Sequence, residues 1–187
     1  MSTVKVKYNF SYTDMHKLFV DNYERTMLLV AAVLQTQRAM IFDAEGAYNG
    51  RERWKPLKFR QGKILSDRGG LRGSIAPRNN GVTPTVGANT ILDVRQNRIT
   101  IGSSLIYAKI HDEGGVIKAK GKALAIPLPK GKSATATAKG LSKSRGGVLF
   151  VKSVTIPKRT FTDFNSQDER ELGDTLVNFL AEVLNNG

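Results

Sequence analysis

The chain of 187 residues contains no cysteine and only two histidines, and these shortages restrict its chemistry. Without cysteine it forms no disulfide, carries no thiolate nucleophile and offers no cysteine-based zinc site. His16 and His111 lie far apart in the sequence, and neither begins the spaced pattern of a metal-ligand set. The sequence therefore predicts a protein without a metal or another cofactor.

Long apolar segments are also missing. The longest runs, such as the one that begins at Met27, are far too short to span a bilayer. The first residues alternate between polar and apolar types, whereas a signal peptide carries an apolar block. With 40% hydrophobic and 24% charged residues, the composition is that of an ordinary globular domain. We expect one domain over residues 1–187, made in the cytoplasm and not associated with a membrane.

Acidic residues are scarce: the chain has 16 of them against 29 lysines and arginines, a formal net charge of +13. Basic residues gather in two segments, 51–63 and 116–147, and the second contains no acidic residue. Such clustering favours contact with nucleic acid or with an acidic protein surface. The residues that we expect to contact DNA or a protein partner are Arg51, Arg53, Lys55, Lys58, Arg60, Lys118, Lys120, Lys122, Lys130, Lys132, Lys139, Lys143 and Arg145.

Trp54 and Phe59 lie among the basic residues of the first segment, and two interpretations are open. Interleaved basic and aromatic side chains can bind a single strand by stacking on its bases. Alternatively, Trp54 anchors a loop on the fold while the charges remain in solvent. We favour the anchor, because the chain has one tryptophan and stacking platforms usually use several aromatic residues.

Helical periodicity begins early in the chain. From Asp14 to about Phe42, apolar residues recur at steps of three and four, with no glycine or proline before Gly46. Thr13 or Asp14 suits the N-cap, and the helix would be roughly 40 Å long.

A second helix is predicted over residues 166–184, with Ser166 or Asp163 as its N-cap. Asp168 and Glu169 in the first turn suit the helix dipole. Its apolar stripe comprises Leu172, Leu176, Phe179, Leu180, Val183 and Leu184.

Strand patterns are short. Period-two alternation of Val4, Val6, Tyr8, Phe10 and Tyr12 predicts a half-buried strand over residues 3–12. The other strand candidates are residues 85–89, 98–103, 105–110 and 148–156, the last ended by Pro157.

Glycines punctuate the middle of the chain. Three of them break a short helix predicted over residues 64–75, in which Leu71 and Ile75 should face inward and Arg72 outward. Tyr107 and Ile110 are expected in the central sheet. After them, Gly114 and Gly115 would supply a turn conformation that other residues resist.

Residues 116–147 differ from the rest of the chain. Low hydrophobicity and charge of one sign favour an extended arm. Within it, residues 124–129 are apolar and fit an edge strand stopped by proline. We expect a long β-hairpin or flexible arm whose tip, near residues 130–146, becomes ordered on meeting a partner.

His111, Asp112 and Glu113 are the only catalytic-looking cluster. Adjacent residues of a strand point to opposite faces, so these three would not converge without a turn. Asp112 more plainly suits a structural role, accepting hydrogen bonds from backbone N–H groups. Because no motif of a known mechanism is completed, the sequence predicts a protein that is not an enzyme.

The order of several segments resembles one known family. After a long helix come Arg53-Trp-Lys-Pro-Leu, the segment from Ile64 to Ile75, the segment from Ile101 to Gly115, Ile156-Pro-Lys-Arg-Thr-Phe and a closing helix. Together, over roughly residues 14–184, they resemble the phage virion morphogenesis family, the Mu-like tail completion and head–tail joining proteins. Lys158 and Thr160 depart from the family's usual small residue and proline.

The resemblance implies structural work in a virion, at the capsid–tail junction or the tail end, after assembly in the host cytoplasm. It implies an α+β fold in which a long N-terminal helix and a C-terminal helix pack a small, twisted, mainly antiparallel sheet. Such proteins usually form rings, so the expected partners are further copies and neighbouring neck and tail proteins: a portal-side connector, a tail terminator or a tube. A contact with packaged DNA is left open, and no small-molecule substrate is expected.

Nine residues are expected to support structure and assembly, with Arg159 pairing with a carboxylate of the same or the next subunit. They are Trp54, Leu71, Tyr107, His111, Gly114, Gly115, Pro157, Arg159 and Phe161. The alternative function is a basic protein that binds nucleic acid.

Overall fold

The computed structural model describes residues 20, 22–57, 62–66, 69–79, 81–95, 98–127, 143–145 and 148–186. Three predictions lie outside these ranges in whole or in part: the strand over residues 3–12, the first turns and N-cap of the helix from Asp14, and most of the arm's tip.

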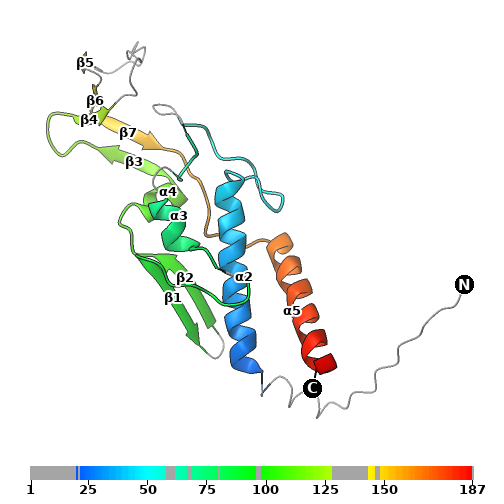
Figure 1. The fold of residues 1–187 in the computed structure, drawn as a ribbon. Coiled ribbons are helices and arrows are strands. Elements are labelled where there is room, and N and C mark those ends of the chain that lie inside the picture. Colours follow the sequence, from blue (N-terminus) through cyan, green and yellow to red (C-terminus); the bar gives the residue numbers. More distant parts are fainter. Residues whose placement is uncertain are drawn as a thin grey trace, which may run out of the picture.

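Two long helices, α2 (Tyr23–Asp43) and α5 (Ser166–Asn186), lie side by side (Figure 1). The predicted end of the first helix and the predicted extent of the last are confirmed to within two residues. α2 is buried on most of its circumference, because a sheet lies on one side of it and α5 on the other (Figure 1).

The N-cap of α5 is Asn165, which corrects the prediction of Ser166 or Asp163. The Oδ1 of Asn165 accepts hydrogen bonds from the backbone N–H groups of Gln167 at 3.1 Å and Asp168 at 2.9 Å. In return, Asp168 Oδ2 accepts one from the backbone N–H of Asn165 at 3.4 Å. This reciprocal arrangement is a capping box, so the start of α5 is encoded locally.

Strands β1 (Thr90–Arg95) and β2 (Arg98–Ser103) form an antiparallel pair in which Thr90 faces Ser103. The pair packs beside α2 and the short helix α3 (Gly70–Ile75). Ser74 and Ser103, hydrogen-bonded through their hydroxyls at 2.7 Å, link α3 to β2. The strand predicted over residues 98–103 is therefore confirmed. Of the short helix predicted over residues 64–75, only the last six residues, Gly70–Ile75, are helical among those that the structure describes.

The strand predicted over residues 85–89 is wrong, because that segment is a loop tied to α2. Buried Gln35 donates to the carbonyl oxygen of Thr85 at 2.8 Å and accepts from its N–H at 2.9 Å. A side chain thus satisfies the backbone groups that a neighbouring strand would otherwise bind. The chain turns through Asn89, with φ of 62°, and the strand begins at Thr90.

The strand predicted over residues 105–110 is also wrong. Helix α4 (Ala108–Glu113) occupies this part of the chain, so Tyr107 and Ile110 are not in a sheet. β2 ends at Ser103, where its partner β1 begins, and the Ser103 hydroxyl accepts a hydrogen bond from the N–H of Leu105 at 3.2 Å. A short apolar run suits either a strand or a helix, and here tertiary packing selects the helix.

A long β-hairpin projects from the body (Figure 1). β3 (Gly115–Lys118) pairs with β7 (Ser153–Ile156), and β4 (Leu124–Pro127) pairs with β6 (Val148–Val151), both antiparallel. β5 (Lys143–Arg145) lies on the other side of β6. The predicted hairpin and the edge strand stopped by proline, β4, are confirmed, as is the α+β class with its small antiparallel sheets.

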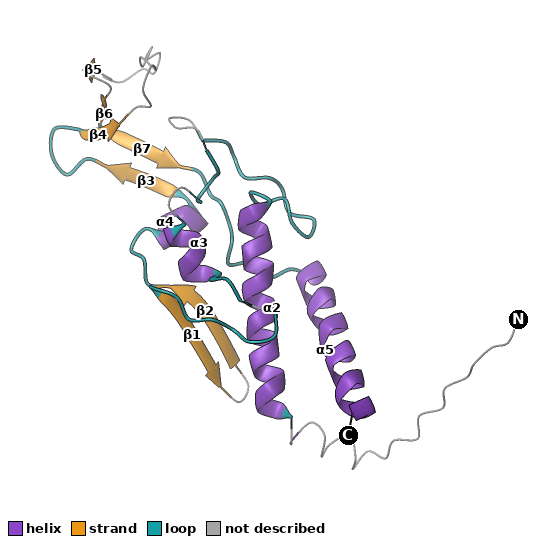
Figure 2. Cartoon of the chain, in the orientation of Figure 1, coloured by secondary structure: helices purple, strands orange, loops and turns teal. Residues whose placement is uncertain are grey.

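The hydrophobic core lies around the C-terminal end of α2. The ring of Phe42 contacts the rings of Trp54, with centroids 5.5 Å apart, and Phe161, at 5.2 Å. Leu71 and Ile75 are buried in the same cluster, as predicted. The loop that carries Trp54 crosses the end of α2 (Figure 2).

Trp54 anchors this loop. Its side chain is 7% exposed, and its Nε1 donates a hydrogen bond to the carbonyl oxygen of Thr160 at 3.2 Å. A ring held in this way is not free to stack on nucleobases. The interpretation of Trp54 as the anchor of its loop is therefore confirmed, and the interpretation as a platform for stacking on bases is not.

Candidate functional site

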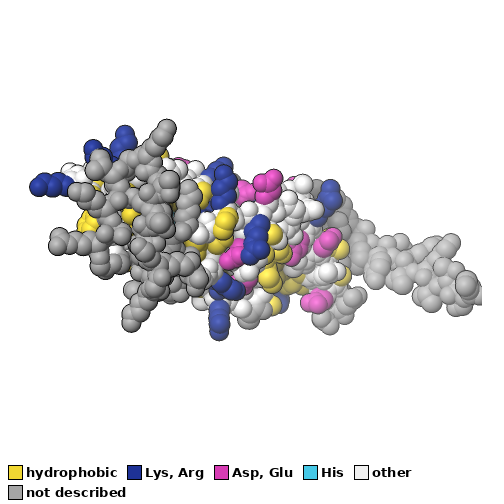
Figure 3. Space-filling view, turned by 90° about the horizontal axis from the view of Figure 1, so that it is seen from above, with side chains coloured by type: hydrophobic (Ala, Val, Ile, Leu, Met, Phe, Trp, Pro, Cys, Tyr) yellow, Lys and Arg dark blue, Asp and Glu magenta, His cyan; other side chains and the backbone are white. Residues whose placement is uncertain are grey.

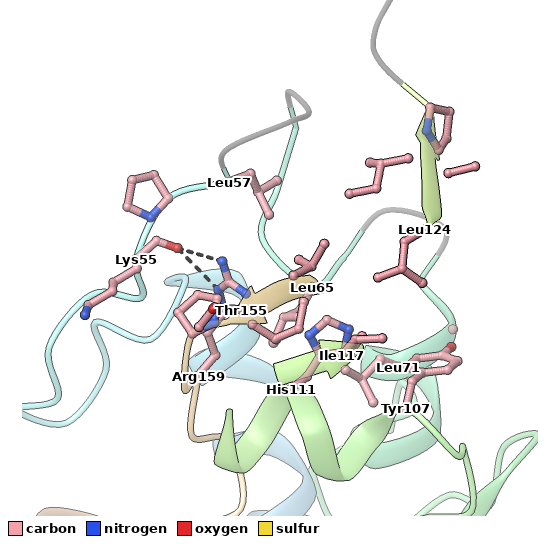
Figure 4. Close-up of a pocket in the computed structure, with 18 of the residues that line it drawn as sticks. Lys55, Leu57, Leu65, Leu71, Tyr107, His111, Ile117, Leu124, Thr155 and Arg159 are labelled. Atoms are coloured by element: carbon pink, nitrogen blue, oxygen red, sulfur yellow. Dashed lines mark hydrogen bonds between the residues drawn. The ribbon is translucent and has the colours of Figure 1, made fainter. Parts of the chain in front are cut away.

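An apolar groove of about 870 Å³ lies where the hairpin leaves the body (Figure 4). Three parts of the chain line it: the loop at Lys55–Leu57 with Leu65, the helices α3 and α4, and the hairpin. Leu57 and Leu65 lie on one side, and Ile117 and Leu124 lie on the other (Figure 4).

Side chains of α4 form part of the groove's floor. Tyr107 and His111 line it, and their rings meet edge to face with centroids 6.1 Å apart. Because both residues belong to one turn at the start of α4, the helix presents them together.

Helix α4 is fastened to the segment that leads into α5. The carboxylate of Asp112 accepts hydrogen bonds from the backbone N–H of Phe161 at 2.8 Å and the hydroxyl of Thr162 at 2.6 Å. The predicted role of Asp112 as an acceptor for backbone N–H groups is confirmed, although the donors lie about 50 positions away rather than in a local turn. The predicted strand geometry of the residues His111 to Glu113 is wrong, since all three are helical.

Arg159 holds the groove's wall. Its side chain is almost fully buried, and its guanidinium donates to the carbonyl oxygen of Lys55 from Nη2 at 3.0 Å and from Nε at 3.3 Å. The N–H of Arg159 donates to the carbonyl oxygen of His111 at 3.0 Å. Arg159 therefore ties the Trp54 loop and α4 to the hairpin's base.

Gly114 permits the close approach of the two hairpin strands at their base. Its φ is 76° and its ψ is 175°, a conformation that residues with a Cβ rarely adopt. A Cβ at Gly114 would lie 2.8 Å from the backbone nitrogen of Lys158. The predicted need for glycine is confirmed at this position, and Gly115 is the first residue of β3.

The structure brings most of the expected assembly residues to one place. Leu71, Tyr107, His111, Pro157 and Arg159 line the groove. In the core beneath it, Trp54 and Phe161 both contact Phe42. What the groove offers chemically is a concave apolar surface with few polar groups, which suits apolar side chains of a partner.

A second cluster, which sequence analysis missed, joins the two long helices. Asp168 of α5 is fully buried, and its Oδ2 lies 3.0 Å from the Nη2 of Arg38 of α2. Arg51 binds both carboxylate oxygens of Asp168, and Asn49 donates to Oδ1 at 2.8 Å. In the sequence, the position of Asp168 in the first turn of the last helix indicates an interaction with the helix dipole and not an ion pair.

Arg51 therefore requires a correction. The sequence predicts its contact with DNA or a partner, but its side chain is only 9% exposed and is paired with Asp163 and Asp168. A buried guanidinium in an internal ion pair is not available to an outside anion. Arg51 stabilises the fold.

The cluster shifts the pKa values of its members. Burial alone would raise the pKa of Asp168, but hydrogen bonds from Arg51 and Asn49 and the charge of Arg38 lower it below the ordinary value of 3.8. Burial lowers the pKa of Arg38, while the hydrogen bond to Asp168 raises that of Arg51. The cluster is therefore charged throughout at neutral pH, and its role is structural.

Comparison with known families decides the class of protein. The model of the phage virion morphogenesis family matches residues 14–181, which is most of the chain. The chain belongs to this family. No curated protein and no solved structure gives a significant match.

As a member of a structural phage family, this virion morphogenesis protein is not an enzyme. Its presence in that family also identifies it as a protein of phage tail assembly. Within the described part of the chain, no helix is both long enough and apolar enough to cross a membrane. Among the same residues, no group of three or more metal-binding side chains comes together.

The other basic residues that the sequence predicts as contacts of this morphogenesis protein fall into four groups. Arg53 and Lys55 lie in the exposed loop, where Arg53 pairs with Glu45. In the hairpin, Lys118, Lys120 and Lys122 are exposed, and basic side chains stand out at this end in Figure 3. Outside the described residues lie Lys58, Arg60, Lys130, Lys132 and Lys139, while Lys143 and Arg145 belong to β5.

Proposed function

We propose that this protein is a ring-forming component of the phage neck or tail end, acting in tail completion or head–tail joining. Its neighbours would be further copies of itself and a portal-side connector, a tail terminator or a tube. Membership of the virion morphogenesis family supports this proposal. So does the shape of the molecule, a helical body from which a long hairpin projects (Figure 1).

The observation that carries the proposal is the set of large apolar side chains left in solvent at the base of the hairpin and along it. Ile106, before α4, is 98% exposed, and Val116 of β3 is 53% exposed. Ile117 and Phe150 are also exposed. Exposed apolar side chains of this size favour association, and copies joined head to tail would cover them around a closed ring.

The projecting hairpin provides the direct test. Deleting residues 130–146 removes β5 but leaves the pairing of β4 with β6, so the variant should fold with an unchanged unfolding temperature. A phage genome that carries the deletion should yield heads and tails that do not join or tails that are incomplete, as counted by electron microscopy. Infectious particles at the normal titre would overturn the assigned role of the hairpin tip.

Contact with DNA is a second candidate role, favoured by the exposed Lys118, Lys120 and Lys122. Replacing these three with alanine should weaken binding to duplex DNA. It should also reduce the salt dependence of binding, by a slope of about 0.9 for each phosphate that the variant no longer neutralises. The matched control is Lys109→Ala, an exposed lysine of α4 outside the hairpin. An equal effect of the control would show that only general charge matters.

A further inference from the structure

We propose that the apolar groove binds residues 3–12 of a neighbouring copy, laid along the groove in an extended conformation. This inference rests on the proposed function only in that copies of the chain must associate. It identifies one contact between them: the N-terminal segment of one copy in the groove of the next.

On the groove side, the lining includes four consecutive residues of β4, Leu124–Pro127, and three of β7, Val154–Ile156. Neighbouring residues of a strand point to opposite faces, so a groove touched by four in a row follows the edge of the strand. β4 is an edge strand of its sheet. An extended segment fits such a site, because it can lie parallel to the strand while its side chains enter the groove.

On the segment side, the sequence supplies a matching pattern. Between residues 3 and 12 every second residue is apolar, and the intervening ones include Lys5, Lys7 and Asn9. In an extended chain, side chains two residues apart are about 6.6 Å apart on one side. The apolar side comprises Val4, Val6, Tyr8, Phe10 and Tyr12. It would enter the groove, and both lysines would stay in water.

The groove of the same copy is out of reach. The segment precedes α2 at the Tyr23 end, whereas the groove lies by the hairpin, near the Asp43 end (Figure 1). A helix of 21 residues such as α2 spans about 31 Å. With the helix that the sequence predicts from Asp14, the residues before Tyr23 cover less than about 15 Å. A neighbouring copy is therefore the donor of the segment.

Because the chain has no cysteine, engineered cysteines give a clean test. A Phe10→Cys chain is mixed with a tagged Ala125→Cys chain at the concentration where wild type associates, and then oxidised. We expect a disulfide-linked pair of the two chains, since a disulfide needs Cα atoms within about 7 Å. Asn9→Cys is the matched control: its side chain points to the opposite side, and its yield should be several-fold lower.

The two mutations placed in one chain distinguish a neighbour from the chain itself. Disulfide-linked oligomers support the proposal. A faster-migrating cross-linked monomer contradicts it, as does an equal yield from Asn9→Cys and Phe10→Cys.

A second measurement uses the full-length chain and a labelled synthetic peptide of residues 2–13. In the Phe10→Asp chain, whose own segment is impaired, the peptide should bind, and adding Ile117→Asp should weaken binding at least tenfold. Ile91→Asp is the matched control, because Ile91 is an isoleucine of β1 with a similar exposure and does not line the groove. Unchanged unfolding temperatures show that these variants are folded.

The outcomes separate this inference from the proposed function. If the Phe10→Asp chain still forms rings like those of wild type and does not bind the peptide, the inference is wrong and the proposed ring stands. Peptide binding that depends on Ile117 in a chain that never forms rings supports the inference and contradicts the proposed ring. If the wild-type chain forms no rings and the Phe10→Asp chain does not bind the peptide, both proposals are wrong.

Discussion

Replacing Asp168 with asparagine should lower the free energy of unfolding by about 3–5 kcal/mol. The carboxylate is fully buried between Arg38 and Arg51, whose side chains are 6% and 9% exposed. Removing one partner of a buried ion pair leaves a buried charge without its counterion, and in other proteins this change costs about 3–5 kcal/mol. Since domains of this kind are stable by only about 5–15 kcal/mol, the loss is a large fraction of the total.

The surrounding residues provide matched controls. Glu171, one turn further along α5, accepts hydrogen bonds from Tyr48 at 2.8 and 2.9 Å but is exposed, so Glu171→Gln should cost at most about 1 kcal/mol. A triple variant with Asp168→Leu, Arg38→Met and Arg51→Met should recover part of the loss, because apolar groups of similar volume leave no buried charge unpaired.

The assay is urea and thermal unfolding followed by the fluorescence of Trp54, the only tryptophan. Trp54 is buried beside Phe42, so its emission reports on the core that holds α2. For a chain of this length, the Asp168→Asn change corresponds to a fall of roughly 6–20 °C in the unfolding temperature. A loss below about 1 kcal/mol, or one equal to that of Glu171→Gln, would refute the idea that the cluster holds the helices together.

Three further outcomes follow from the same structure. Gly114→Ala should lower the free energy of unfolding in urea by about 1–3 kcal/mol, because the backbone of Gly114 has a conformation that alanine rarely adopts. Gly121 has open space around it, so Gly121→Ala should change the free energy of unfolding by less than about 0.5 kcal/mol, and equal effects of the two variants would refute this account. Asn165→Ala should lower the free energy of unfolding by about 1 kcal/mol, because it removes the helix cap, and Ser166→Ala should leave it nearly unchanged. A larger loss for Ser166→Ala than for Asn165→Ala in thermal unfolding would identify Ser166 as the cap. The pKa of Asp168 in the folded protein lies below 3.8, so its contribution to the free energy of unfolding is complete above about pH 4 and is lost as pH falls through that pKa. The difference in urea midpoint between wild type and Asp168→Asn should therefore be smaller at pH 3 than at neutral pH. A difference that stays constant would contradict the charge argument.

The sequence predicts best where local signals agree with the fold. Residues 98–103, the hairpin strands and the last helix are predicted correctly, because alternation, proline and the apolar stripe act within each segment. Residues 85–89 and 105–110 are predicted incorrectly, because their structure depends on distant groups. Gln35 supplies the hydrogen bonds of Thr85 from 50 positions away.

The candidate site follows the same rule. Sequence reasoning selects Tyr107, His111 and Arg159, which meet in the groove, but it does not show that the hairpin forms the opposite wall. It assigns Arg51 to an outside partner because the residue lies in a basic segment. The acidic partners of Arg51, Asp163 and Asp168, are more than 110 positions away, so no local pattern reveals the pairing.

The central claim is that this protein assembles with itself as a discrete ring, and its mass in solution tests this most directly. Light scattering on the purified chain, at moderate salt with and without duplex DNA, should give one defined multiple of 20.5 kDa that does not change when DNA is added. A 20.5 kDa monomer at every concentration, which shifts onto generic DNA and is released steeply as salt rises, would contradict the account and identify a nucleic-acid-binding protein instead.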